Sequence, residues 1–425
     1  MKLNRLLLLS LGVVLLMACR REGCTDQTAI NYDDKAKNDN GSCVYDEATP
    51  GGGGSGGSGG SGGTGPGGET LPIRLTGTET SNITIQDQST NPNVADYYID
   101  GAWRIDADIV IEPGVNIEMR ASSYIEVKAN GSLSAVGTPS NKINIFGANS
   151  NKGFWNYITF ESSNNPNNKL IHCNISGGGK SSYRDATVYL KGNSMLAMEN
   201  SSIDKSALYG LAVASSDSKL ASFSNNSFNN CDKEPIYVHN FSQVSIMDNS
   251  NSFGLGNAKN RVEVGGGNVD VPTQVSNLGV PYFCSGSSRL YSQVEVYEGV
   301  KFLMGAGTYI EVNSSAYLNM QGTGSNPIDI RGDVNPNTQG YWKYITFEDS
   351  NNPNNVFSNV DIYDGGGSSY RDATVYLKGN SQLRMGGSSI NYSARDGLGG
   401  SASATYIDNG GNSYSNNVGT DNVYP

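Results

Sequence analysis

One stretch of fourteen residues occurs twice in this chain. SSYRDATVYLKGNS fills residues 181–194 and recurs without a change at residues 368–381, an offset of 187. The same offset relates WNYITFE at residues 155–161 to WKYITFE at residues 342–348. A register that is held over separate blocks excludes chance similarity. The sequence therefore predicts two tandem copies of a unit of about 187 residues.

Within each copy, apolar residues alternate with polar ones. YIEV at residues 124–127 recurs at residues 309–312 with an offset of 185, so two residues are inserted between the repeated blocks. In the first of these segments, Ile125 and Val127 alternate with Glu126. Such a period of two predicts short strands with one buried face, and clusters of Gly, Asn and Ser separate them.

Two architectures fit short strands joined by polar turns: an antiparallel sandwich or propeller, and a solenoid whose coils stack on one another. The solenoid is favoured because the turns vary in length while the inward residue types repeat, whereas hairpins would show two-residue turns such as Asn-Gly. Asparagines at the bends of residues 223–231 stand where amides can hydrogen-bond from coil to coil.

The turns also carry a resemblance. GTPSNKI at residues 137–143 and GTGSNPI at residues 322–328 resemble the turns of right-handed parallel β-helix proteins. The resemblance covers about residues 97–425 and implies an all-β chain folded as a right-handed parallel β-helix. At roughly 23 residues per coil, this body would have about 14 coils.

Composition excludes several classes of protein. The chain has 54 glycines and only 16% charged residues, which disfavours a helical fold. Lys and Arg number 29 against 40 Asp and Glu, so a nucleic-acid partner, which requires a basic face, is excluded. With His172 and His239 as the only histidines, His-rich metal sites and most Ser/His or Cys/His catalytic arrangements are hard to build.

The N-terminal residues have the pattern of a targeting signal. Residues 1–18 have a cationic start and a short apolar stretch, and the LMAC segment ending at Cys19 resembles the lipobox of bacterial lipoproteins. The resemblance implies cleavage before Cys19, acylation of that residue and anchoring to a lipid bilayer rather than spanning it. We expect an outer-membrane location, with the cell-surface side favoured.

Residues 19–48 contain the lipidated N-terminus and a segment bounded by Cys24 and Cys43. This segment resembles a short module related to thrombospondin type 3 repeats. Outside the cytoplasm a Cys24–Cys43 bridge is expected, worth roughly 3 kcal/mol. Both a calcium-bound loop and a metal-free loop fit, the calcium ligands being Asp26, Asn38, Asp39 and Asn40.

The remaining divisions follow from composition and period. Residues 49–70 are a flexible Gly/Ser linker. Residues 71–96 are predicted to cap the solenoid, residues 97–252 to form copy 1, residues 253–290 to join the copies, and residues 291–425 to form copy 2. We expect one continuous solenoid to run through the joining segment.

The sequence shows no recognisable arrangement of catalytic residues. The paired carboxylates of glycosidases and the acidic clusters of calcium-assisted lyases are not recognisable, so an enzyme is the less favoured interpretation. Trp155, Trp342 and the thiol of Cys173 are predicted to be packing residues. Cys231 and Cys284 are not assigned a bridge.

The repeated block offers the best candidate for a ligand contact. Its turn places an Arg that can grip a carboxylate or sulfate and a Tyr that can stack on a sugar ring. The alternative is a structural turn in which Arg pairs with the adjacent Asp. The candidate residues are Tyr183, Arg184, Asp185, Tyr370, Arg371 and Asp372.

These observations favour a cell-envelope lipoprotein that presents a β-helix as a non-catalytic binding or adhesion module. Its expected partners are the lipid bilayer, through Cys19, and a glycan or another surface protein. A polysaccharide lyase or glycoside hydrolase of the β-helix type is the alternative, and a structural accessory subunit of an outer-membrane complex is the third.

Overall fold

The structure is a computed structural model that describes residues 22–23, 34–39 and 71–419. The chain divides into two units, residues 1–59 and residues 60–425. No helix in the described ranges is long and apolar enough to cross a membrane.

In the first unit, β1 (Glu22–Gly23) pairs in parallel with β2 (Asn38–Asp39). Asn38 and Asp39, two of the expected calcium ligands, therefore belong to β2. The other residues assigned here from sequence lie outside the described residues, so their roles stay predictions; they are Cys19, Cys24, Asp26, Asn40 and Cys43.

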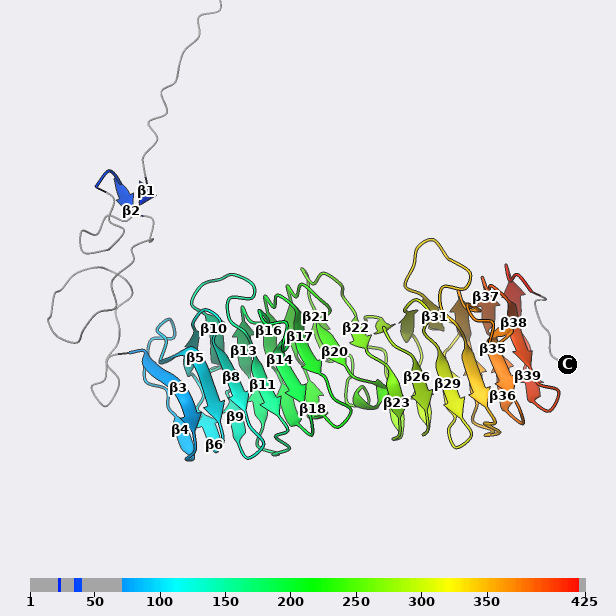
Figure 1. Ribbon diagram of the computed structural model, residues 1–425, viewed down its shortest axis with the longest axis horizontal. Helices are drawn as coiled ribbons and strands as arrows, with labels where there is room; N and C mark the ends of the chain where they lie inside the picture. The colour runs from blue at the N-terminus through cyan, green and yellow to red at the C-terminus, as the bar shows by residue number, and fades with distance from the viewer. Residues whose placement is uncertain (1–21, 24–33, 40–70, 420–425) are drawn as a thin grey trace, which may run out of the picture. The chain divides into compact units, whose positions relative to one another are not determined.

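Strands run from end to end of the second unit, and every strand pair in its described part is parallel (Figure 1). The expectation of an all-β chain with parallel strands is confirmed, and the arrangement is that of a β-helix-like solenoid. Successive strands along the chain turn from one face to the next, and each pairs with strands of the coils before and after it. The paired strands form five columns.

The first column belongs to the N-terminal half of the solenoid. Its strands are β3 (Ile73–Glu79), β5 (Tyr97–Ile105), β7 (Asn116–Met119), β10 (Ile143–Gly147), β13 (Cys173–Ser176), β16 (Ser202–Asp204), β19 (Ser227–Asn229) and β21 (Ser252–Phe253). The third column lies in the same half. Its strands are β4 (Ile83–Ile85), β6 (Asp108–Ile111), β9 (Ser132–Val136), β12 (Lys169–Ile171), β15 (Met195–Glu199) and β18 (Lys219–Ser224).

The second column runs through both halves. After the second parts of β3 and β5 its strands are β8 (Tyr124–Val127), β11 (Ile158–Glu161), β14 (Ala186–Lys191), β17 (Tyr209–Val213), β20 (Ile236–Val238), β22 (Val262–Val264), β25 (Tyr282–Cys284), β28 (Lys301–Met304), β31 (Ile328–Gly332), β34 (Val360–Tyr363), β37 (Ser389–Asn391) and β40 (Ser413–Ser415). With β3 and β5 these make fourteen stacked strands, of which thirteen lie within residues 97–425, where about 14 coils were expected.

Two further columns belong to the C-terminal half. The fourth contains β23 (Gly267–Val269), β26 (Ser288–Leu290), β29 (Ile310–Asn313), β32 (Ile345–Glu348), β35 (Ala373–Lys378) and β38 (Asp396–Gly400). The fifth contains β24 (Thr273–Val275), β27 (Val294–Val296), β30 (Leu318–Gln321), β33 (Val356–Ser358), β36 (Gln382–Gly386) and β39 (Thr405–Asp408).

Inward side chains of successive coils stack in register and fill the core. In the second column, Ile125 is followed by Ile158, Val188 and Leu211, all without exposed surface. The alternation in sequence therefore identified the buried face correctly. Cys173 is buried as expected, and burial raises the pKa of its thiol to about 12.

Asparagine amides connect the coils at the bends. The Asn226 side chain donates to Oδ1 of Asn251 at 3.1 Å, and the backbone N–H of Ser201 donates to Asn226 Oδ1 at 3.1 Å. Because Asn226 and Asn251 are buried, these bonds satisfy polar groups that would otherwise cost free energy. The coil-to-coil amide ladder expected for residues 223–231 is confirmed.

The second column stays hydrogen-bonded throughout the solenoid. The two halves meet at the point where this column moves from one face of the solenoid to the next. The strands β10 and β13 of the first column have β31 and β34 as their sequence counterparts, and these belong to the second column. Between the halves, the 3-10 helix η1 (Phe241–Gln243) takes the place of a strand. The residues 253–290 otherwise fold as coils stacked in parallel. Strands β3 and β4 of residues 71–96 likewise pair with β5 and β6.

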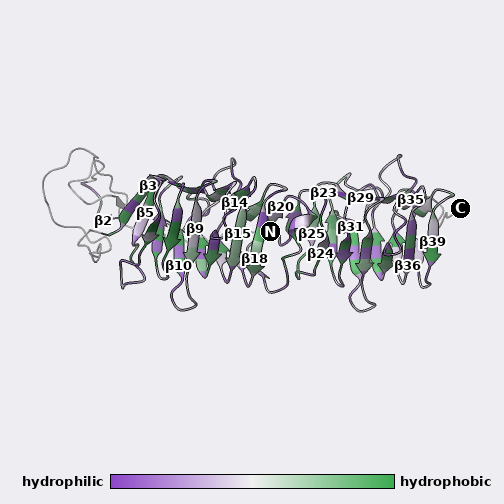
Figure 2. Ribbon diagram, turned by 90° about the horizontal axis from the view of Figure 1, so that it is seen from below, coloured by the Kyte–Doolittle hydropathy of each residue, from purple (hydrophilic) through white to green (hydrophobic). Residues whose placement is uncertain are grey.

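Despite this change of column, equivalent strands of the two copies lie on the same side of the second unit. Both views place β14 and β35 on one side (Figures 1 and 2). Seven coil-to-coil steps separate these two strands along the stack.

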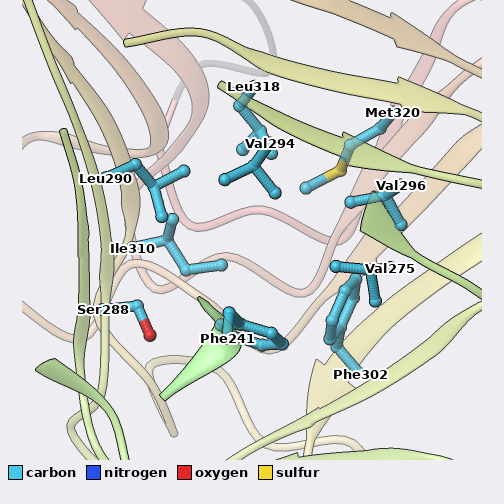
Figure 3. A pocket seen from close by; sticks show the side chains of 10 residues that line it. All are labelled: Phe241, Val275, Ser288, Leu290, Val294, Val296, Phe302, Ile310, Leu318 and Met320. Carbon is cyan, nitrogen blue, oxygen red and sulfur yellow. The ribbon is translucent and has the colours of Figure 1, made fainter. Parts of the chain in front are cut away.

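A small apolar cavity lies in the core near the start of the C-terminal half (Figure 3). It adjoins Ser288, a buried polar residue among aliphatic and aromatic neighbours. At the offset of 185, Ser288 corresponds to Trp103, which lies in register between Gly77 and Ile125 as Ser288 does between Gly267 and Ile310. The cavity therefore marks the volume that a tryptophan fills in copy 1.

Replacing Ser288 with leucine is expected to raise the free energy of unfolding by about 0.5–2 kcal/mol, because it adds apolar contacts in this cavity. Leucine is preferred to tryptophan because the Trp103 indole donates to Glu79, whose counterpart in register is Val269. Chemical denaturation measures the change, with Ser288→Ala as the control. A lower stability for the leucine variant would show that the space is too small to fill.

Candidate functional site

Tyrosines gather around a buried arginine in each copy. The first tyrosine patch lies on the second column around β8, β11 and β14, and the second lies on the fourth column around β29, β32 and β35. The first patch consists of Tyr124, Tyr157, Tyr183 and Tyr189, and the second of Tyr309, Tyr344, Tyr370 and Tyr376.

The most exposed ring in each patch is the tyrosine of the repeated block. Tyr183 is 70% exposed and Tyr370 is 67% exposed. Each stands in the turn before β14 or β35, where its backbone N–H donates to the hydroxyl oxygen of Ser181 or Ser368. Each ring centroid lies 4.0 Å from the guanidinium carbon of the following arginine. The guanidinium group packs against the inner face of the tyrosine ring, and the outer face of the ring stays exposed to solvent.

The arginines themselves are buried, and each is paired with a glutamate. Arg184 is 6% exposed, and its Nε donates to Glu161 at 2.7 Å. Arg371 is 7% exposed and donates to Thr346 at 3.1 Å and to Glu348. The expectation that these guanidinium groups grip a ligand carboxylate is therefore corrected, because each is already paired with a glutamate of the preceding coil.

The alternative pairing with the neighbouring aspartate is also wrong. Asp185 pairs with Lys233 at 3.0 Å, and Asp372 is exposed. A contact between residues of different coils could not be read from the block itself. Among the six candidate residues of the two repeated blocks, Tyr183 and Tyr370 are the exposed aromatic rings.

A second arginine supports the other end of each patch. Arg104 pairs with Glu126 at 3.1 Å and donates to the hydroxyl of Tyr124. Tyr124 in turn contacts Tyr157, with ring centroids 5.1 Å apart. In copy 2 the corresponding pair is Arg289 with Glu311 at 3.8 Å, and Tyr309 lies 5.4 Å from Tyr344.

The sequence did not identify these further tyrosines as site residues, although Tyr124 and Tyr157 lie within the repeated segments YIEV and WNYITFE. Burial raises the pKa of Tyr157 and of Tyr344, with their neighbouring tyrosines adding to the shift. Both hydroxyls are therefore protonated at neutral pH and able to donate hydrogen bonds. Trp155 and Trp342, predicted to pack, are fully buried.

No family model, curated protein or solved structure matches this chain.

The two copies provide a comparison within the molecule. On the outward side of the first column, three asparagines form a ladder in which Asn174 donates to Asn144 and Asn144 donates to Asn116, at 2.9 and 2.8 Å. Their counterparts in copy 2 are Lys301, Asp329 and Asp361. This face has changed in charge, whereas the tyrosine patches have kept all their residues.

Within the described residues, no group of three or more His, Cys, Asp and Glu side chains is gathered as a metal site requires. The glutamates beside the patches are paired with arginines instead. Burial alone raises the pKa of Glu348, but hydrogen bonds from Arg371, Lys378 and Thr346 outweigh it, so the pKa lies below its ordinary value of 4.5.

The stability that Glu348 provides is expected to depend on pH. A carboxyl whose folded-state pKa is depressed stabilises the fold above its unfolded pKa, and this contribution disappears as the pH falls through the folded value. Glu348→Gln should therefore cost about 1–3 kcal/mol at pH 7 and less at pH 3. Urea denaturation of both proteins at the two pH values measures the difference, and an equal cost at both would contradict the assignment.

Proposed function

We propose that this protein is a cell-envelope lipoprotein whose solenoid is a non-catalytic binding module for glycans. The two tyrosine patches are its binding sites. They lie on one side of the second unit, so both can face the same extended ligand (Figures 1 and 2). The ligand class follows from the exposed aromatic rings, whose faces stack on sugar rings while neighbouring hydroxyls donate hydrogen bonds.

One observation carries the proposal: exposed residues of the repeated block are the same in both copies. Ser182, Tyr183, Lys191 and Asn193 are exposed, as are their identical counterparts in residues 368–381. Packing does not explain this identity, because exposed side chains contribute little to stability. Recent duplication does not explain it either, because the outward asparagines of the first column were replaced by charged residues in copy 2.

The remaining features of the proposal concern fold detail and location. We propose that the solenoid is right-handed, the hand that parallel strands joined by crossovers adopt, and that it consists of two tandem copies. Acylated Cys19 would hold the protein on the outer membrane, on the cell-surface side, and the linker of residues 49–70 would let the solenoid stand away from the bilayer. Metabolic labelling with a fatty acid tests the anchor, and an unlabelled protein would contradict it.

The segment between Cys24 and Cys43 is proposed to be a disulfide-closed loop that takes calcium through the oxygen ligands named above. Mass spectrometry of the non-reduced protein tests the bridge, and two free thiols there would refute it. Calcium titration of the same sample tests the metal, and heat of binding that is unchanged in Asp26→Ala would refute these ligands.

An array of bacterial and host glycans, probed with the purified protein, tests the proposed function. Binding to extended glycans is expected for the wild type and not for the variant Tyr183→Ala with Tyr370→Ala. The bound glycan should be recovered intact. New reducing ends or unsaturated products would contradict a non-catalytic module.

A further inference from the structure

A lysine ammonium lies beside the tyrosine patch in both copies, yet the two lysines occupy different sequence positions. In copy 1, Nζ of Lys180 lies 2.8 Å from Oγ of Ser122, two residues before Tyr124. In copy 2, Nζ of Lys343 lies 5.5 Å from the ring centroid of Tyr309. At the offset of 187, the counterpart of Lys180 is Gly367 and that of Lys343 is Asn156.

The two positions are neighbours in space. The backbone N–H of Lys180 donates to the carbonyl of Trp155 at 3.1 Å, and that of Gly367 donates to the carbonyl of Trp342 at 2.9 Å. Residue 180 therefore lies beside residue 156 on the adjacent coil, as residue 367 lies beside residue 343. A lysine at either position reaches the same place from a neighbouring coil.

The side chains of Lys180 and Lys343 also reach equivalent places on the solenoid. Ser122, which Lys180 contacts, corresponds to Gly307 at the offset of 185. A Cβ atom at Gly307 would lie 4.0 Å from Cε of Lys343. Each copy carries a lysine at one of these two positions and not at the other. The positive charge is therefore present in both copies, although a different residue provides it.

Lys180 and Lys343 differ in this respect from the arginines of the patches. Arg104, Arg184, Arg289 and Arg371 are each paired with a glutamate. Within residues 71–419, neither Lys180 nor Lys343 forms an ion pair. An ammonium that has no carboxylate partner and stands beside a pair of contacting tyrosines is suited to an anionic group of a ligand whose rings lie on the tyrosines.

We infer that each tyrosine patch contains an anion subsite, formed by Lys180 in copy 1 and Lys343 in copy 2, and that the ligand is an acidic glycan. The inference rests on the proposed function and specifies its ligand class. A uronate carboxylate and a sulfate ester offer the same chemistry to an ammonium. The protein as a whole has a net charge of −11, so local placement of these two cations, rather than overall attraction, provides the selectivity.

The test compares binding of the full-length protein to polygalacturonate, dextran sulfate and neutral dextran by calorimetry at two salt concentrations. Lys180→Gln combined with Lys343→Gln is expected to weaken binding of the acidic polymer by about tenfold or more per site and to flatten its salt dependence. Polygalacturonate and dextran sulfate distinguish the carboxylate from the sulfate. Equal loss for both indicates a subsite that accepts either.

The sequence offers a matched rescue. The rescue starts from the Lys343→Gln variant, in which Lys180 is the remaining lysine of the two subsites. In this variant, the further change Lys180→Gly should abolish binding to the acidic polymer. Lys180→Gly combined with Asn156→Lys should restore the binding. The restored variant has the arrangement of copy 2 in copy 1. Failure of the rescue, with thermal melting unchanged, would overturn the inference.

The two proposals fail in different ways. If the lysine variants bind acidic polymers like the wild type while the tyrosine variants do not, the anion subsite is wrong and the glycan-binding module remains. If the tyrosine variants bind like the wild type, the proposed function itself is wrong.

Discussion

Replacing either Tyr183 or Tyr370 with alanine is expected to weaken binding to a long glycan by about 10²–10⁴-fold, because a ligand held at two points would then be held at one. The double replacement is expected to abolish binding. The removed ring is the exposed surface of each patch, and the arginine beneath it keeps its glutamate partner in the variant. The fold should therefore survive the change.

The size of this effect depends on the separation of the two patches. Seven coil-to-coil steps separate β14 from β35, and parallel strands stack about 4.8 Å apart, so the patches are about 34 Å apart. Continuous hydrogen bonding of the second column makes this separation fixed. A rigid spacing gives a high effective concentration only for a ligand long enough to reach both sites.

Chain length is therefore the discriminating variable. A glycan longer than about 34 Å should lose avidity in either single variant, whereas a shorter fragment should bind the single variants with about half the capacity and unchanged affinity. Surface plasmon resonance with a length series measures both, and Tyr183→Phe, which retains the ring, is the matched control. Equal affinity for short and long chains would show that the patches act separately.

The second large effect is expected from Trp342→Ala, which should lower the free energy of unfolding by about 3–5 kcal/mol. The indole is fully buried, and its Nε1 donates to the carbonyl of Tyr363 at 2.7 Å. Alanine would leave a cavity and an unpaired carbonyl between two coils. Because each coil contacts only its neighbours, the damage should stay largely within copy 2.

The two remaining tryptophans report this directly. Trp103 and Trp155 both lie in copy 1, so fluorescence of the Trp342→Ala variant follows that half, while circular dichroism follows the whole solenoid. The dichroism signal should begin to fall at lower denaturant than the fluorescence. Coincident transitions would show instead that both halves unfold as one cooperative unit. Trp342→Phe, which retains a ring, should lose less stability.

How far the sequence predicts the site can be followed in the arginines. The repeated block placed Tyr183 and Arg184 in a turn, but the partner of Arg184 is Glu161, on the preceding coil. Tyr183 and Tyr370 were identified as candidates from the repeated block, but the sequence did not link Tyr124 and Tyr157 to them. A ligand contact assigned to the arginine belongs instead to the ring that the arginine supports.

The sequence alone determined what depends on one strand at a time. Alternation along each strand indicated which side chains face the core and correctly placed Cys173 there, and the predicted packing role of Trp155 and Trp342 agrees with their burial. The repeated blocks predicted two tandem copies, and the bends predicted amide hydrogen bonds. These features follow from neighbours a few residues apart, whose geometry the extended backbone sets directly.

Only the tertiary structure decided which side chains of different coils meet. Coil lengths vary widely: Ile345 stacks on Ile310 after 35 residues, whereas Tyr282 stacks on Val262 after 20. Turns of variable length leave the stacking register unspecified by spacing, so the Arg184–Glu161 pair and the shared position of the Lys180 and Lys343 ammonium groups emerge only when the coils are packed together.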